Sequence, residues 1–274
     1  MSPIKEIGQA FEGIQQAKIG APAFCTNFFP VQTKLQGWID HGELLAERRA
    51  GAVFFLRKDH EFWHLYFCAA DVPTLQREMA TLSSLSGERV VVDLVGREGA
   101  LEGMLNAAET SGFRRYRRLL RLIRASEPGR PQLSAASTQV VWADQTDRRA
   151  ISELLEGSFD RYADQLAMPY EIEGAITARQ ILVIRCDGVL AALLFFETQG
   201  LTSTVRYWVV AERFRSQRFG AALMHHYFAL HPAVRRFLLW VTADNEEAVH
   251  KYRHYGYLPE GLIDHVLVNP MIHS

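Results

Sequence analysis

Apolar and polar positions alternate or cluster in short runs along the second half of the chain, which is typical of strands in a sheet. Asp187-Gly188 separates two of these runs and predicts a tight hairpin turn. Helical spacing of apolar residues predicts one helix that starts near Asp144 and two later ones. The predicted strands are 139–142, 181–185, 189–197, 203–210, 237–241 and 262–268, and the two later helices are 223–230 and 246–255. This order predicts an α/β (α+β) mixed sheet with helices on both faces.

The end of the first half repeats this pattern. A strand at 89–95, a helix at 98–110, Gly112 and a strand-like run at 114–124 match the strand, helix, Gly256 and strand of the second half. We interpret this as a diverged internal duplication. A Pro- and Gly-rich stretch separates the halves. The predicted domains are therefore 1–125 and 137–274, joined by a linker at 126–136.

Composition restricts the class of protein. The 274 residues are 48% apolar, which is enough for packed cores, and the net charge of −1 gives no support for nucleic-acid binding. The three cysteines are widely spaced and form no Cys-x-x-Cys pair, which favours a reducing cytoplasm over a disulfide framework. We expect no signal peptide and no membrane span, since no apolar run is long enough.

One stretch carries a recognisable combination of motifs. A strand is followed by a loop that opens a helix, then by a strand, an Asn-x-x-Ala-x-x-x-Tyr helix and a Gly-aromatic pair. This order resembles the GNAT acyltransferase superfamily. Together with the duplication it predicts tandem GNAT-like units. The residues that carry the resemblance are Arg215, Ser216, Gln217, Arg218, Phe219, Gly220, Ala221, Asn245, Ala248, Tyr252, Gly256 and Tyr257.

The resemblance implies a binding site for acetyl-CoA or another acyl-CoA. In the family, the loop at 215–221 binds the pyrophosphate with backbone N–H groups at a helix N-terminus. The pantetheine arm pairs with the backbone of a strand that splays from its neighbour, here Trp208, Val209 and Val210. Arg218 replaces the middle glycine of the family pattern, so it either crowds the loop or places a charge on phosphate. Asn245 is either a helix N-cap or a pantetheine contact.

The resemblance also assigns chemistry. Tyr252 matches the family tyrosine that protonates the departing thiolate, and a phenol is protonated at neutral pH. The strand before the loop holds no carboxylate, so Glu197, at the end of the preceding strand, is the nearest candidate base. Asp264 and His265 are weaker candidates. Arg206 either binds an acceptor carboxylate or forms an ion pair across the sheet.

The first repeat lacks these residues. Its segment 70–77 contains no glycine, and Ala108 stands where the second repeat has Tyr252. We therefore expect a degenerate unit that serves packing, substrate shaping or partner binding.

Three functional hypotheses follow. The first is an N-acyltransferase that moves an acyl group from acyl-CoA to a small-molecule amine by direct attack in a ternary complex, with no metal. In the second, an acyl carrier protein is the donor and docks on the basic run 114–124, although a solvated sheet edge protected by charge is the commoner explanation of such a run. The third is a non-catalytic binding protein. The acceptor, the acyl chain length and the oligomeric state are not encoded in any motif.

Overall fold

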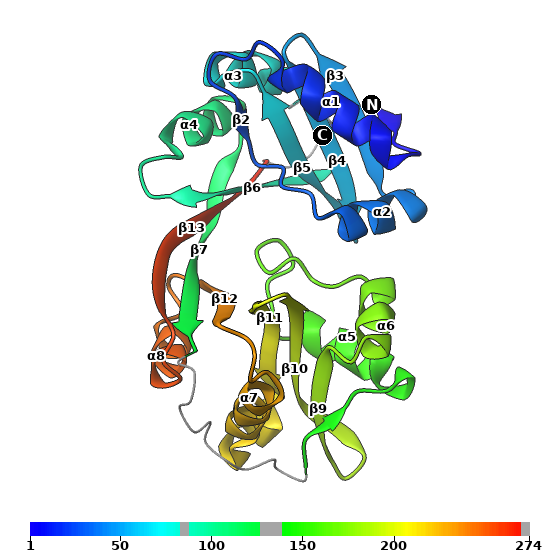
Figure 1. Cartoon of the computed structure of the whole chain (residues 1–274), viewed down its shortest axis with the longest axis vertical. Helices are drawn as coiled ribbons and strands as arrows, with labels where there is room; N and C mark the ends of the chain where they lie inside the picture. Colours follow the sequence, from blue (N-terminus) through cyan, green and yellow to red (C-terminus); the bar gives the residue numbers. More distant parts are fainter. Residues whose placement is uncertain (83–87, 127–138, 270–274) are drawn as a thin grey trace. The chain divides into compact units, whose positions relative to one another are not determined.

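The computed structural model describes residues 1–82, 88–126 and 139–269. The chain divides into two compact units (Figure 1). Unit 1 comprises Met1–Leu119 and Gly261–Ser274, and unit 2 comprises Leu120–Glu260. Most of the predicted linker, residues 127–136, lies outside the described residues. No helix in the described ranges is long and apolar enough to cross a membrane.

Unit 1 is a mixed sheet with helices packed on it, and its strands follow the order β1-β3-β4-β5-β6-β13, with β2 paired to β5. Helices α1 and α2 cover one face and bury an apolar cluster that includes Leu35, Phe55 and Phe28. The elements are β1 (Ser2–Pro3), α1 (Ile7–Lys18), β2 (Cys25–Thr26), α2 (Gln32–Asp40), β3 (Leu44–Arg49), β4 (Ala52–Asp59), β5 (Phe62–Ala69), α3 (Val72–Ala80), β6 (Arg89–Arg97) and α4 (Glu102–Thr110).

Unit 2 repeats this plan with the strand order β12-β11-β10-β9-β8. One apolar cluster lies between the sheet and α7, and a second lies between the sheet and helices α5 and α6. Asp187 and Gly188 both have positive φ in the turn between β9 and β10, which confirms the predicted hairpin. The elements are β8 (Val141–Trp142), α5 (Arg148–Glu156), α6 (Pro169–Thr177), β9 (Ile181–Cys186), β10 (Val189–Gln199), β11 (Thr202–Val210), α7 (Phe219–Leu230), β12 (Arg236–Thr242) and α8 (Glu246–His254).

The duplication is visible in the topology. In each unit an antiparallel pair (β4–β5 or β10–β11) is followed by a parallel pair (β5–β6 or β11–β12), with one helix (α3 or α7) between the parallel strands. A second helix (α4 or α8) then ends at a glycine with positive φ, Gly112 or Gly256. The fold is therefore a tandem arrangement of two similar mixed α/β units.

The two repeats exchange their last strands. Strand β13 (Leu258–Val268) follows the helices of unit 2, yet it pairs antiparallel with β6 of unit 1, from Leu262 opposite Arg97 to Val268 opposite Val91. Conversely, the end of β7 (Arg114–Ala125) belongs to unit 2, where Leu122 is fully buried. The compact units thus differ from the predicted domains, because the prediction let each repeat keep its own last strand.

Candidate functional site

The parallel strands β11 and β12 part at a defined point. Their paired positions run from Thr202–Arg236 to Val205–Leu239, while β11 continues to Val210. On its other side β11 stays paired with β10, but the register shifts so that Arg206 is an extra residue. A bulge of this kind bends a strand and increases its twist. The bulge therefore explains why β11 leaves β12 at Arg206.

Beyond the bulge, one edge of β11 turns toward the gap. The Ala211 N–H donates to the Ala191 carbonyl of β10, at 2.9 Å. Ala211 therefore forms a hydrogen-bonded pair with β10. Such pairs alternate with non-hydrogen-bonded pairs along an antiparallel ladder, so the N–H and C=O groups of Trp208 and Val210 point away from β10. The same alternation directs the backbone of Val209 toward β10. Of the three backbones predicted to bind pantetheine, two face the gap.

The predicted phosphate loop lies between β11 and α7. Residues Arg215 to Arg218 are exposed, and Phe219 begins the helix. Arg218 adopts a left-handed conformation with φ of 58°, which favours glycine. This is the position of the middle glycine in the family pattern, so Arg218 keeps the backbone shape that glycine would give. The first hydrogen bond within the helix runs from the Ala222 N–H to the Arg218 carbonyl. The N–H groups of residues 219–221 come before it, so they have no acceptor within the helix.

Trp208 brings the strand, the loop helix and the last helix together. Its indole Nε1 donates to the Gly220 carbonyl at 3.1 Å, and its ring lies 5.6 Å from that of Tyr252. A Cβ added to Gly220 would stand 3.1 Å from the Trp208 ring. Glycine at position 220 thus lets the helix backbone pack closely against the Trp208 ring, and no unusual φ requires it. Two of the predicted site residues, Gly220 and Tyr252, meet at the predicted strand.

The Tyr252 side chain is held in its protonated form. Burial raises the pKa of its phenol, and the charge of Asp164 raises it further. The hydroxyl therefore stays protonated throughout the neutral range. Among the described residues, its contacts are rings rather than hydrogen-bond acceptors: Trp208 on one side and Tyr257, at 5.9 Å, on the other.

Asn245 has the simpler of its two predicted roles. Its side-chain oxygen accepts a hydrogen bond from the Ala248 N–H at 3.0 Å, which caps α8. Ala248 packs against the apolar cluster under α7.

Comparison with known proteins identifies this arrangement. The profile of the acetyltransferase (GNAT) family matches residues 148–257, which lie within unit 2 and include every predicted site residue except the weaker candidates Asp264 and His265. Unit 2 carries a GNAT domain over these residues. A comparison with curated proteins finds no match.

Solved structures share the fold at low sequence identity. A tandem GNAT protein from the clavulanic acid biosynthesis pathway has a TM-score of 0.65 and 12% identity, over 100% of this chain and 98% of that one. GCN5-related N-acetyltransferases from Kribbella flavida and Sphaerobacter thermophilus each have a TM-score of 0.57. The Kribbella flavida protein is 18% identical, over 88% of this chain and 95% of that one. The Sphaerobacter thermophilus protein is 14% identical, over 89% of this chain and 87% of that one. These likenesses support the tandem GNAT-like fold.

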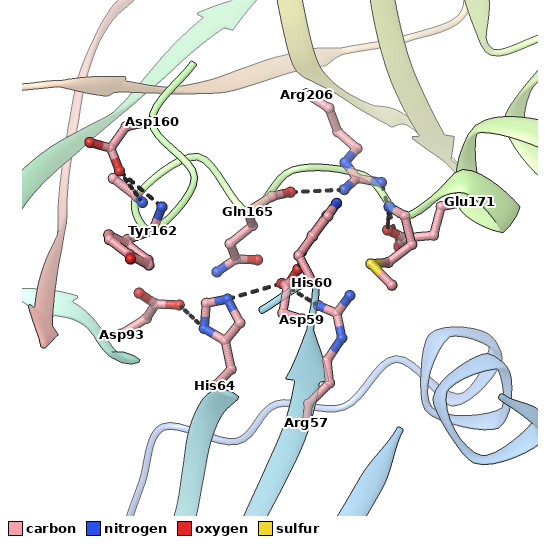
Figure 2. Close-up of polar contacts among 12 residues, drawn as sticks. Arg57, Asp59, His60, His64, Asp93, Asp160, Tyr162, Gln165, Glu171 and Arg206 are labelled. Carbon is pink, nitrogen blue, oxygen red and sulfur yellow. Dashed lines mark hydrogen bonds and ion pairs between the residues drawn. The ribbon is translucent and has the colours of Figure 1, made fainter. Parts of the chain in front are cut away.

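The candidate base of the GNAT domain is already engaged. Glu197 lies on β10, where its carboxylate is 3.2 Å from the Arg206 guanidinium, and Glu171 is 3.7 Å from the same group. Arg206 also donates to the Gln165 carbonyl (Figure 2). The Tyr207 hydroxyl donates to the same carbonyl at 2.6 Å. Of the two roles predicted for Arg206, the contacts show the ion pair across the sheet.

Asp264 and His265 belong to unit 1 rather than to the GNAT domain of unit 2, because they lie on β13. Burial raises the pKa of Asp264 well above its usual range, and the nearby charge of Asp93 adds to the shift.

Unit 1 holds a buried charged cluster that the sequence did not indicate. The His64 ring lies between two carboxylates (Figure 2), with Nε2 3.1 Å from Asp59 and Nδ1 3.4 Å from Asp93. Arg57 stands 3.5 Å from Asp59. Burial alone would lower the pKa of His64, but the two carboxylates raise it to about 9. The two carboxylates thus favour the protonated form of the buried His64 ring at neutral pH.

The basic run on β7 is largely neutralised within each unit. Four of its arginines contact a glutamate or an aromatic ring. The expected sheet edge is not found, because β7 lies between β13 and β12 in the strand order. The contacts are Arg115 with Glu109 at 2.7 Å, Arg118 with Glu98 at 2.9 Å, Arg121 with Glu260 at 2.5 Å, and Arg124 over the Phe228 ring at 3.9 Å. These contacts account for four of the arginines within the fold, and docking of a carrier protein stays a prediction.

Proposed function

We propose that unit 2 transfers an acyl group, most simply acetyl, from acyl-CoA to a primary amine. The observation that carries this proposal is the outward-facing backbone edge at Trp208 and Val210, flanked by the loop helix on one side and by Tyr252 on the other. An extended chain with amide groups can pair with that edge as a strand would. The phosphates then extend toward the N–H groups at the start of α7.

The reaction needs one bond to form and one to break. The neutral amine attacks the thioester carbonyl, whose oxygen gains charge that backbone N–H groups can stabilise. As the carbon–sulfur bond breaks, the Tyr252 hydroxyl gives its proton to the sulfur. The amine's own proton leaves through water, with Glu197 as the proposed acceptor. The ion pair between Glu197 and Arg206 stabilises the charged carboxylate and holds it in place.

Calorimetry tests the proposal directly. We expect acetyl-CoA to bind the full chain with a stoichiometry of one, since the helix opening in unit 1 contains no glycine and Ala108 occupies the position of Tyr252. Absence of heat at millimolar ligand would contradict acyl-CoA binding. A stoichiometry of two would contradict the degenerate character of unit 1.

Substitution of Arg218 separates its backbone role from its charge. Arg218→Gly should change the free energy of unfolding by no more than about 1 kcal/mol, because relief of the left-handed strain opposes the entropy of glycine. Loss of a charge-assisted hydrogen bond costs about 1.5–3 kcal/mol, so the Kd for acetyl-CoA should rise by roughly 10–150-fold. Acetylpantetheine, which lacks the phosphates, is the control ligand. Equal losses with both ligands would show that Arg218 does not bind phosphate.

A further inference from the structure

Unit 1 repeats the parting of strands that forms the proposed slot in unit 2. The paired positions of β5 and β6 end at His64 and Val91, although β5 runs on. Phe67 stands three residues beyond the last pair, as Trp208 stands three residues beyond Val205. The ladder with β4 alternates so that the Phe67 N–H and C=O face the gap. The two units therefore have equivalent edges at Phe67 and Trp208.

In unit 1 this edge is occupied by the chain itself. Strand β2 pairs antiparallel with β5, with Cys25 opposite Ala69 and Thr26 opposite Cys68, and it lies along β5 in Figure 1. The pairing extends to Ala23, whose N–H donates to the Ala70 carbonyl at 3.1 Å. We refer to residues 23–27 as the plug segment. It takes the place along β5 that an added strand would take.

Asn27 closes the gap at the point where the strands part. Its side-chain oxygen accepts from the Phe67 N–H at 2.7 Å. Its side-chain nitrogen donates to the Leu65 carbonyl of β5 at 3.0 Å and to the Asp93 carbonyl of β6 at 3.1 Å. One primary amide thus satisfies backbone groups on both strands. The amides of a pantetheine arm offer the same kinds of donor and acceptor.

Neighbouring residues fix the plug segment in position. The Thr26 hydroxyl donates to the Phe67 carbonyl at 2.7 Å. Phe28 follows directly and is only 4% exposed, with its ring 4.6 Å from that of Phe55. Buried aromatic contact of this kind anchors the segment more firmly than a surface edge strand.

The phosphate end of the site is also filled internally. The helix after β5, α3, begins with Val72 and Pro73, and the Asp71 carboxylate accepts from the Thr74 N–H at 2.8 Å. A negative charge of the protein therefore sits at the helix N-terminus that corresponds to the loop helix of unit 2.

We propose that unit 1 contains a slot for a pantetheine arm and that the plug segment fills it as an internal surrogate. This rests on the proposed function of unit 2, where the equivalent edge takes the cofactor. The ligand class of the slot is an extended chain with two amides, without phosphates, since Asp71 would repel them. The plug segment makes unit 1 independent of cofactor and leaves one acyl-CoA site in each chain.

Residue-resolved hydrogen exchange of the full chain tests this inference. In the wild type, the Phe67 amide should be protected without ligand, whereas Trp208 and Val210 should gain protection only with acetyl-CoA. Asn27→Ala removes the acceptor of the Phe67 N–H and should raise its exchange rate roughly tenfold or more. Saturating pantetheine should then restore protection at Phe67 in Asn27→Ala and change nothing in the wild type. Asn27→Asp keeps the acceptor oxygen and should keep Phe67 protected.

Two results would overturn the inference. One is fast exchange of Phe67 in the wild type, which needs no variant to fold. The other is an Asn27→Ala chain in which Phe67 exchanges fast and pantetheine gives no protection. Failure of acetyl-CoA to protect Trp208 and Val210 would instead count against the proposed function of unit 2, and the exchange of Phe67 would still report on the plug segment.

Discussion

Tyr252→Phe should lower turnover by about 10²–10⁴-fold while the affinity for acyl-CoA stays nearly unchanged. The hydroxyl is needed only as the carbon–sulfur bond breaks, so its loss should appear in kcat rather than in binding. The aromatic ring remains, so the contacts with Trp208 and Tyr257 should survive. The measurement is steady-state release of free thiol from acetyl-CoA with an accepted amine, beside calorimetry of acetyl-CoA binding.

The pH dependence gives a second readout of this role. A free thiol has a pKa of about 8.5, so the thiolate leaves more easily without help as the pH rises. The defect of Tyr252→Phe should therefore shrink at high pH. In the wild type, burial raises the pKa of the Tyr252 phenol, so the acid itself should not be lost over that range.

Tyr255 provides a matched control for Tyr252. Its ring also lies 5.6 Å from Trp208, and it too carries a hydroxyl. Tyr255→Phe should leave turnover within about twofold of the wild type, since this hydroxyl has no part in the proposed proton transfer. Wild-type turnover in Tyr252→Phe, with chemistry shown to limit the rate, would reduce Tyr252 to a packing residue.

His64→Gln should lower the free energy of unfolding of unit 1 by about 3–5 kcal/mol at pH 7. The variant leaves the Asp59 and Asp93 carboxylates buried without the cation between them. Urea denaturation, followed with a probe in unit 1, measures the loss. His60→Gln is the control: His60 also contacts Asp59, but its side chain is 31% exposed, so the change should be smaller.

The stability of the wild type should also fall with pH in a defined window. The pKa of His64 in the folded chain, about 9, is above its ordinary value of 6.5, so folding is favoured by the protonated ring. This stabilisation is complete below pH 6.5 and is lost as the pH rises through about 9. His64→Gln should lack this slope. A parallel slope in both proteins would place the titration elsewhere.

The local parts of the fold and site were readable from the sequence. The Asp187-Gly188 pair is enough to specify its hairpin turn. The resemblance named Gly220 and Tyr252 as site residues, and the structure shows that both contact Trp208. The loop holds Arg218 in a left-handed conformation that arginine does not itself prefer. The sequence pattern therefore could not decide whether Arg218 crowds the loop or contacts phosphate. The backbone N–H and C=O groups of Val209 point toward β10 instead of the gap. Which residues point which way depends on the register of β10 and β11, and the sequence of one strand does not give that register.

The non-local parts were not readable. Asn27 looks like an ordinary polar residue between Thr26 and Phe28, and only the fold brings it to Phe67 and Asp93. His64 stands in a strand pattern, with its carboxylates five residues before it and on another strand. The exchange of β7 and β13 was missed for the same reason, because a strand pattern does not name its partner.

The pairing of β6 with β13 also determines which unit can finish folding first during synthesis. Val91 pairs with Val268, so the edge of β6 that faces β13 stays unpaired until the ribosome has made residues 262–268. Residues Leu120–Glu260 are complete earlier, and domains generally fold as units as they are synthesised. We expect the later repeat to fold first during translation, while the earlier one waits with an exposed strand edge that invites aggregation. Any slowing of synthesis after Glu260 prolongs that interval.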